Sequence, residues 1–313
     1  METRKLIKFG GSSHIIAIPN EWIKKNSLNK GDLIYIKENG DNELILQHSP
    51  KERVEEEKVI NIDANKDIKE IKREITAAYT KNFNVIEIYG NNIEKYGPEI
   101  KDHINNLVAI EVIEESSNRI IARDFLNIKE VSIENMIRRM DTIIRLMIEN
   151  IEREKPEIAY SEIKNLDSGI NKIRFMLYKV IRTALDDIDI ARKFGMTNYD
   201  LLDRWMVINY LEEIADELRR FMRFKIRSKL SKKDIKNLDE CFHEITDTFI
   251  KVMEAYYKRD RSLAHQMTSQ KDDQLRKYDE ISQETKNKDM VLLLEKIKSL
   301  GSLIRCIARG VIM

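Results

Sequence analysis

The chain of 313 residues carries 55 Lys and Arg against 54 Asp and Glu, a formal net charge of +1, which disfavours both a globally basic nucleic-acid protein and an acidic tail. Hydrophobic residues make up 42% and charged residues 35%, and only 10 Gly and 4 Pro interrupt the chain, so long amphipathic helices are expected. At about 150 residues per domain, the length predicts two or three domains.

Two cysteines, Cys241 and Cys306, are too few for a disulfide framework and lack zinc-site spacing. The first residues lead into a short apolar alternation instead of a hydrophobic signal core. The longest apolar runs, such as 291–294, are far shorter than the roughly 20 residues of a membrane-spanning helix. We therefore expect a cytoplasmic protein with no secretion signal and no transmembrane segment.

Residues 1–48 have the pattern of short strands. Apolar runs at 6–9 and 14–18 flank a Gly-Gly-Ser-Ser turn, and Pro19 begins a short helix that ends near Gly31. Residues 32–36 and 43–46 predict a hairpin around Asn39-Gly40. Since fewer than 50 residues with four short strands form a marginal fold alone, we expect this unit to dimerise.

These residues resemble the AbrB/MazE/SpoVT family, whose members are swapped-hairpin dimers that often bind DNA. The resemblance is carried by spaced Gly-Ser, Ile-Pro and Gly-Asp signals in three segments, which are Ile7 to Ser13, Ile16 to Pro19, and Trp22 to Ile36. It implies that Arg4, Lys5 and Lys8 make the basic contacts to DNA.

Phe9 and Ala17 stand where similar antitoxins often have arginine, and residues 1–48 hold seven Lys and Arg against six Asp and Glu. Two interpretations of this region stay open. It binds DNA through phosphate contacts doubled by the dimer, or it serves only for dimerisation.

Residues 59–127 predict a small α/β domain. Strands are expected at 59–63, 85–89, 109–113 and 119–123, and helices at 67–80 and 93–107, the second interrupted at Gly97-Pro98. The order βαβαββ implies a mixed sheet, and the segment has no Gly-rich phosphate motif.

From Ser132 the hydrophobic period is helical. Six helices are expected, with Ser132 as the first N-cap, Pro156 at the start of the second and Gly195 before the third; the last three cover 231–257, 262–284 and 289–313. Shifts of 105 and 86 residues align Asp167 with Asp272 and Ile214-Ala215 with Leu300-Gly301. The tail therefore predicts two three-helix repeats, 131–228 and 231–313.

This repeat and the run Tyr210 to Asp216 resemble the PhoU family of six-helix proteins. The complete order is similar to archaeal PhoU-type regulators. The expected fold is multidomain α+β, with a swapped-hairpin β domain, a small α/β domain and an all-α six-helix bundle. The process implied by the resemblance is control of phosphate uptake.

The PhoU resemblance also implies a metal site made of acidic pairs four residues apart, which lie on one helical face. Glu212 and Asp216 match such a pair, and Asp167 matches the first position of another whose partner is Asn171, a neutral and weaker ligand. A divalent or ferric ion bound weakly in the first repeat is one interpretation. The other is that these acids only solvate a charged helix.

In the second repeat Asp272 is kept, but Arg276, Lys298 and Ser302 stand where further acids are expected, so we expect no metal there. Glu240 and His243 form one Glu-x-x-His motif, whereas a di-iron site needs a second copy. With no Ser/His/Asp or Cys/His constellation to argue for, we expect the protein not to be an enzyme.

The densest basic stretch ends the third helix of the tail. Cations are favoured there by the helix dipole, or they bind an acidic partner, DNA or a membrane transporter. The residues are Arg219, Arg220, Arg223, Lys225, Arg227 and Lys229.

The function expected from these patterns is a homodimeric transcriptional regulator of phosphate homeostasis. The alternative is an adaptor that does not bind DNA and docks on a phosphate transporter or signalling kinase through the tail. A metal-dependent enzyme of the bundle is a third, remote class.

Overall fold

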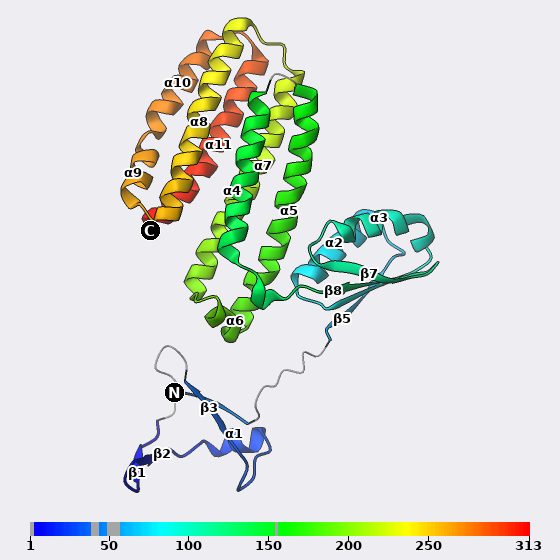
Figure 1. Ribbon diagram of the computed structural model, residues 1–313, viewed down its shortest axis with the longest axis vertical. Helices are drawn as coiled ribbons and strands as arrows, with labels where there is room; N and C mark the ends of the chain where they lie inside the picture. The colour runs from blue at the N-terminus through cyan, green and yellow to red at the C-terminus, as the bar shows by residue number, and fades with distance from the viewer. Residues whose placement is uncertain (1–2, 39–43, 49–56, 154–155) are drawn as a thin grey trace. The chain divides into compact units, whose positions relative to one another are not determined.

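The computed structural model describes residues 3–38, 44–48, 57–153 and 156–313 (Figure 1). The chain divides into two compact units, Met1–Glu56 and Glu57–Met313. Each unit is described by itself below. The predicted tight turn at Asn39-Gly40 lies outside the described residues.

The first unit contains two small antiparallel hairpins and one short helix. Strands β1 (Ile7–Phe9) and β2 (Ser13–Ile15) pair, as do β3 (Tyr35–Glu38) and β4 (Leu44–Gln47), and helix α1 (Asn20–Lys25) lies between the two hairpins in the chain. Gly10 and Gly31 adopt positive φ angles of 67° and 101°, which glycine tolerates at turns. The expected order of two strands, a helix and a hairpin is confirmed.

The second unit begins with the α/β domain. Its elements are β5 (Val59–Asp63), α2 (Ile68–Thr80), β6 (Val85–Tyr89), α3 (Ile93–Asn105), β7 (Ile110–Glu115) and β8 (Arg119–Asp124). The strand order is β5-β6-β8-β7, with β5 parallel to β6 and the other pairs antiparallel. The mixed sheet and the βαβαββ order are as predicted.

Helix α3 differs from expectation because it runs unbroken through Pro98. A proline inside a helix removes one backbone hydrogen bond, here to the carbonyl of Glu94. Both residues lie on the exposed face of α3, so water can satisfy the freed carbonyl.

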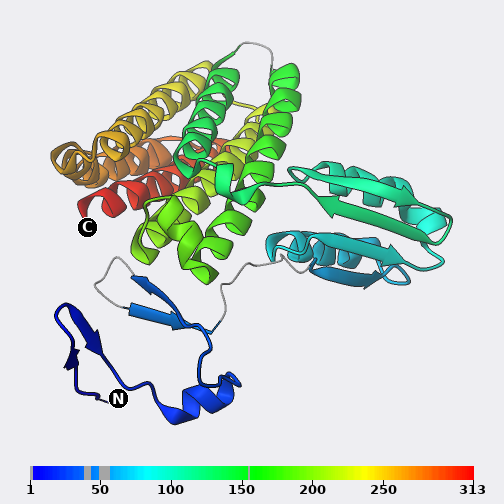
Figure 2. The same cartoon turned by 60° about the horizontal axis from the view of Figure 1, so that its bottom comes forward.

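Helices α2 and α3 cover one face of this sheet (Figure 2). Alternate strand residues such as Ile86, Ile88 and Ile120 point to that face and are fully buried with Ile71 and Ile100 of the helices. This core is separate from that of the helical bundle. Its strand residues alternate between buried and exposed faces, so the period-two pattern of the sequence is enough to predict which of them form the core.

The rest of the second unit is helical. After the short 3₁₀ helix η1 (Ile128–Glu130) come α4 (Ile133–Glu152), α5 (Pro156–Asp186), α6 (Ile188–Lys193), α7 (Asn198–Arg227), α8 (Lys232–Lys258), α9 (Arg261–Ser269), α10 (Lys271–Glu284) and α11 (Lys288–Ile312). Ser132 caps α4 as predicted, and capping boxes with Thr197 and Ser231 begin α7 and α8.

Two details of the helices were not predicted. The short helix α6 fills part of the expected break, and the single helix expected over 262–284 is divided at Gln270 into α9 and α10. Asp187 supplies the N-cap of α6 and Asp260 that of α9, whereas α10 begins after Gln270 without a side-chain cap, so a local capping side chain explains the start of α6 but not the division at Gln270.

The helices share one hydrophobic core from Ile128 to Ala308. In the first half α4, α5 and α7 pack together, in the second α8, α9 and α11, and α7 packs against α11 to join the halves (Figure 1). Each half thus corresponds to three main helices, and in the second half α9 and α10 together take the place of one of them.

The α/β domain is fixed to α5 by a buried ion pair. Lys179 on α5 pairs with Asp124 at the end of β8, and its ammonium group lies 4.8 Å from the centre of the Tyr79 ring on α2. None of the helices in the described parts of the chain is long and apolar enough to cross a membrane.

Candidate functional site

The first unit exposes its apolar side chains. None of its described residues with an assigned burial, 3–36 and 44–48, is buried. Leu33 is 72% exposed, Ile36 65% and Phe9 65%. Large exposed apolar side chains gathered in one small unit are typical of a surface that binds another protein surface.

The three predicted DNA-binding residues lie at the start of this unit, and all are exposed. Only Lys8 lies within β1, where it is opposite His14. Because strand side chains alternate, Lys8 points away from the face that carries Ile7 and Phe9. Arg4 and Lys5 precede the strand. The apolar face is therefore left for pairing while Lys8 stays on the other side.

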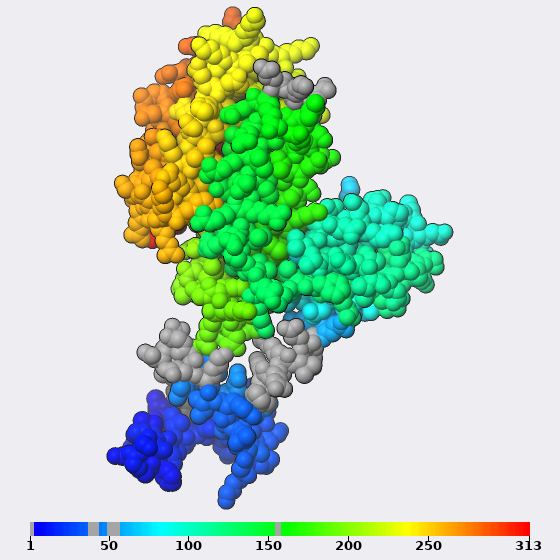
Figure 3. Space-filling model, viewed as in Figure 1, coloured from blue at the N-terminus to red at the C-terminus, as the bar shows by residue number. Residues whose placement is uncertain are grey.

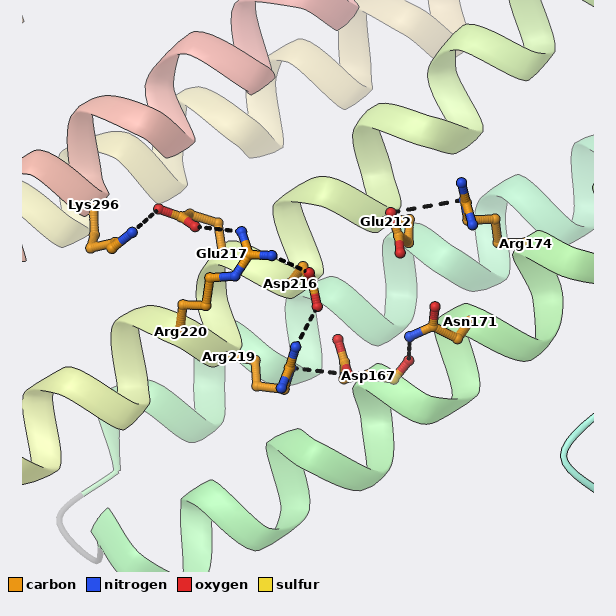
Figure 4. A network of polar contacts seen from close by, with 9 residues as sticks. All are labelled: Asp167, Asn171, Arg174, Glu212, Asp216, Glu217, Arg219, Arg220 and Lys296. Atoms are coloured by element: carbon orange, nitrogen blue, oxygen red, sulfur yellow. Dashed lines mark hydrogen bonds and ion pairs between the residues drawn. The ribbon is translucent and has the colours of Figure 1, made fainter. Parts of the chain in front are cut away.

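The predicted acidic cluster does come together, between α5 and α7. Asp167 on α5 faces Asp216 and Glu212 on α7 (Figure 4). Burial raises the pKa of the Asp167 carboxyl, while the Arg219 guanidinium lowers it and the Asp216 charge raises it. Burial likewise raises the pKa of Glu212, which Arg174 lowers and both aspartates raise. The three acids thus repel one another in a half-buried site.

Two arginines of α7, Arg219 and Arg220, neutralise this cluster. Arg219 Nε lies 3.1 Å from Asp167 Oδ2, and its Nη2 donates to Asp216 Oδ1 at 2.6 Å. Arg220 Nη2 donates to the other oxygen of Asp216 at 2.6 Å. A guanidinium therefore bridges Asp167 and Asp216, the position a metal ion would need (Figure 4).

Asn171 and Glu212 do not complete a metal-ligand set. The Asn171 amide donates to the backbone carbonyl of Asp167 at 3.1 Å, a contact within its own helix. Glu212 Oε2 lies 3.8 Å from Arg174 Nε. Across the part of the chain that the structure describes, no group of three or more His, Cys, Asp or Glu side chains is placed to hold a metal ion. Metal binding here stays a prediction, and it requires Arg219 to move.

The network continues into the second half of the bundle. Arg220 Nη1 donates to Glu217 Oε2 at 3.2 Å, and the other oxygen of Glu217 lies 3.1 Å from Lys296 Nζ on α11. Alternating charges therefore connect α5, α7 and α11. In this arrangement the charges hold helices together, and sequence reasoning missed it because Arg219 and Arg220 were read as part of a basic stretch.

The second half contains a buried arginine at the matching position. Arg305 is 3% exposed, and its Nη2 contacts Gln274 Oε1; Gln274 in turn donates to Thr248 at 3.2 Å. A Cβ on Gly301 would lie 2.7 Å from Arg305 Nη1, so the glycine makes the space for the guanidinium. The same 86-residue shift that aligns Ile214-Ala215 with Leu300-Gly301 aligns Arg219 with Arg305. This alignment was the sequence signal from which the buried arginine could have been predicted.

In the second half, two basic residues that stand where the PhoU resemblance implies acids pair with other carboxylates. Arg276 Nη2 donates to Asp273 at 3.0 Å, and Lys298 lies 2.7 Å from Asp279. Near the Glu-x-x-His motif, His243 is 3.8 Å from Glu152 and 3.7 Å from Asp247. Neighbouring Cys241 is buried, which raises the pKa of its thiol to about 11.

The predicted basic stretch is divided by the fold. Arg219 and Arg220 bind the acidic cluster, and Lys225 lies 3.1 Å from Asp239. Arg223, Arg227 and Lys229 form no ion pair with a described carboxylate.

Lysines from two other segments adjoin the end of this stretch. We call this group the cationic end: Lys229, Lys232, Lys233, Lys286 and Lys288. Because Lys286 and Lys288 lie more than 50 positions away in the chain, no local pattern could have revealed the group.

Residues 7–55 match the model of a family described as antidote-toxin recognition MazE, bacterial antitoxin. This match agrees with the predicted resemblance of residues 1–48 to the AbrB/MazE/SpoVT family. No curated protein and no solved structure matches the chain.

Proposed function

We propose that the protein is a homodimeric DNA-binding regulator that acts through its N-terminal unit. The carrying observation is that the unit matching the MazE family has no buried residue among 3–36 and 44–48. Pairing with a second copy buries that apolar surface and doubles Arg4, Lys5 and Lys8 into one basic patch.

Dimerisation is tested with Ile36→Asp in the full chain. Ile36 is 65% exposed on β3, so the charge is tolerated in a monomer but would be buried in a dimer. Sedimentation should show a dimer for wild type and a monomer for the variant. Ile188→Asp, at a 48% exposed position of the bundle, is the matched control and should stay dimeric. A monomeric wild type would refute the proposal.

DNA binding is tested with Lys5→Glu/Lys8→Glu. Anisotropy with the protein's own promoter duplex should show binding by wild type that the charge-reversed variant loses while it remains a dimer. Equal binding by both would favour the adaptor, in which the first unit only dimerises.

The regulated process we propose is phosphate uptake. Its support is the resemblance of the bundle to the PhoU family and the arrangement of its helices into two similar halves. Transcripts of phosphate-transport genes should change when the gene is deleted and phosphate is limiting. Unchanged transcripts would contradict the proposal that phosphate uptake is the regulated process, without contradicting DNA binding by the N-terminal unit.

A tail that docks on a transporter or kinase is the second candidate. The cationic end favours it, because exposed lysines suit an acidic protein surface. Co-purification of the protein with a membrane transporter, lost on Lys286→Glu/Lys288→Glu, would support the adaptor.

A further inference from the structure

We propose that the cationic end of the bundle is a second nucleic-acid contact, which binds the phosphate backbone without reading sequence. This inference rests on the proposed DNA-binding function. It assigns to the helical tail a part in that function beyond the N-terminal unit.

Two segments are held together to form the centre of this surface. The α7–α8 turn carries Lys229, while Lys286 lies in the α10–α11 connection and Lys288 begins α11. The side-chain amide of Asn287 donates to the Lys229 carbonyl at 2.7 Å, and the Lys229 amide donates to Asp289 at 3.1 Å. The lysine positions are therefore fixed relative to one another by backbone contacts.

The surface is shallow and open. A hollow of about 630 Å³ is lined by Lys229, Lys286 and Lys288 with four uncharged or acidic residues, Asp234, Thr285, Asn287 and Asp289. A neighbouring hollow shares Asp234, Thr285 and Lys286 with the first and adds Lys233, Asn237, Ile281 and Glu284. Figure 3 shows the yellow surface near the start of α8 and the orange surface near the end of α10 adjoining at this end of the bundle. An open hollow suits a polymer backbone better than an enclosed small ligand.

The three acids at this end, Asp234, Glu284 and Asp289, keep their charge but are held in place by contacts within the surface. Asp234 accepts hydrogen bonds from Ser231 and from Thr285 Oγ1 at 3.2 Å, and Asp289 accepts one from the Lys229 amide. Glu284 lies 3.3 Å from Lys233, in an exposed pair that water and salt screen.

Four lysines of the cationic end, Lys229, Lys232, Lys286 and Lys288, form no ion pair with any carboxylate in the described residues. Their charges are therefore free to act on a partner. Ser231 and Asn287 each accept a hydrogen bond from one first-turn amide of α8 and α11, so the lysines are the main source of attraction for a phosphate.

Nucleic acid fits these charges better than a lipid surface does. The first hollow has no aliphatic or aromatic lining residue that could insert among lipid chains. The N-terminal unit carries only one net positive charge within residues 1–48. Additional phosphate contacts are needed if DNA binding is to persist at physiological salt, and this end supplies five lysines against three acids, Asp234, Glu284 and Asp289.

The test compares Lys229→Gln/Lys286→Gln/Lys288→Gln with wild type in the full chain. A matched control, Lys193→Gln/Lys251→Gln/Lys271→Gln, removes three exposed lysines elsewhere in the bundle. Anisotropy titrations use a random-sequence duplex and the promoter duplex at several salt concentrations. Thermal melting checks that both variants keep the wild-type fold.

We expect the plot of log K against log salt to lose about 0.9 of slope for each phosphate contact removed, and therefore about 2 to 3 in the test variant. Preference for the promoter over random duplex should not change, since phosphate contacts carry no sequence information. The control variant should retain the wild-type slope.

Each other outcome overturns the inference in a distinguishable way. A wild-type slope in the test variant, with binding still lost in Lys5→Glu/Lys8→Glu, refutes the second contact and leaves the regulator intact. No duplex binding by wild type at low salt refutes both. Unchanged DNA binding together with lost binding to anionic phospholipid vesicles would assign the surface to a membrane instead.

Discussion

Arg219 on α7 and Arg305 on α11 occupy matching positions in the two halves of the bundle, but their surroundings differ. The Arg219 side chain is 29% exposed and bridges Asp167 and Asp216. Arg305 is 3% exposed and meets an amide, Gln274, with no carboxylate partner among the described residues. Burial accordingly lowers the pKa of Arg305, whereas Asp216 raises that of Arg219.

The difference shows how an arginine at equivalent positions of two similar halves can have two different roles. In the first half the arginine balances acids, so its charge stabilises the helix contacts around it. In the second half a glycine, Gly301, replaces Ala215 and admits the guanidinium into the core. There the charge carries a desolvation cost that a neutral amide offsets only in part.

The largest effect is expected from filling the space at Gly301. Gly301→Val should reduce the free energy of unfolding by about 2–3 kcal/mol, because its side chain would meet Arg305 and Ile245. In an Arg305→Met background the same change should be tolerated much better. Urea unfolding measures both.

Gly310→Val on the same helix is the control, since a Cβ there meets nothing within 4 Å. Equal losses at both glycines would mean that backbone propensity, not the arginine, explains the effect.

Opposite signs are expected when each arginine is changed to methionine. Arg219→Met leaves Asp167 without its guanidinium partner and Asp216 with Arg220 alone, and should cost about 2 kcal/mol. Arg305→Met removes a buried charge without stranding a carboxylate and should be neutral or stabilising by about 1 kcal/mol. Chemical denaturation at neutral pH measures the difference, and a larger loss at Arg305 would contradict the comparison.

A third experiment asks whether Arg219 competes with a metal ion. Arg219→Ala should bind Mn²⁺ at least about tenfold more tightly than wild type, a change of about 1.4 kcal/mol, because it frees the space between Asp167 and Asp216. Calorimetry measures the affinity. Arg139→Ala, an exposed arginine of α4, is the control, and Asp216→Ala should abolish the gain. Equal affinities in Arg219→Ala and wild type would remove this cluster as a metal site.

The smallest effect concerns the pH dependence of Glu212. Because its pKa is raised in the folded state, the folded protein holds a proton that the unfolded chain has lost, and stability falls as pH rises through the raised pKa. Glu212→Gln should remove this fall and stabilise the protein by about 0.5 kcal/mol at pH 7, with little change near pH 4. Melting curves across that range test it, and an unchanged profile would mean that Arg174 fully compensates the acid.

Much of the fold could be read from hydrophobic period and capping residues. The strands at 59–63 and 85–89 have the predicted bounds, and Ser132 caps α4 as expected. These features depend on neighbours within a few residues. The unbroken helix at Pro98 was harder because it depends on solvent exposure, which depends on packing, and the division at Gln270 was harder because no capping side chain marks the start of α10.

The candidate site shows the same division. Spacing placed Glu212 and Asp216 on one face of α7, and the PhoU resemblance indicated Asp167 as part of the same site. Spacing could not show that Arg219 bridges two of the acids or that Asn171 turns to its own backbone. Side-chain partners depend on which helices face each other.

The sequence by itself determined the order of elements, the halves of the bundle and the match of the N-terminal unit, because each is encoded in local pattern. Only the tertiary structure decided which charges are neutralised and which remain. Arg219 binds acids on a facing helix, while Lys229 joins Lys286 and Lys288 from a distant loop. Electrostatic interactions act through space over a few ångströms, so their balance is set where the folded helices meet.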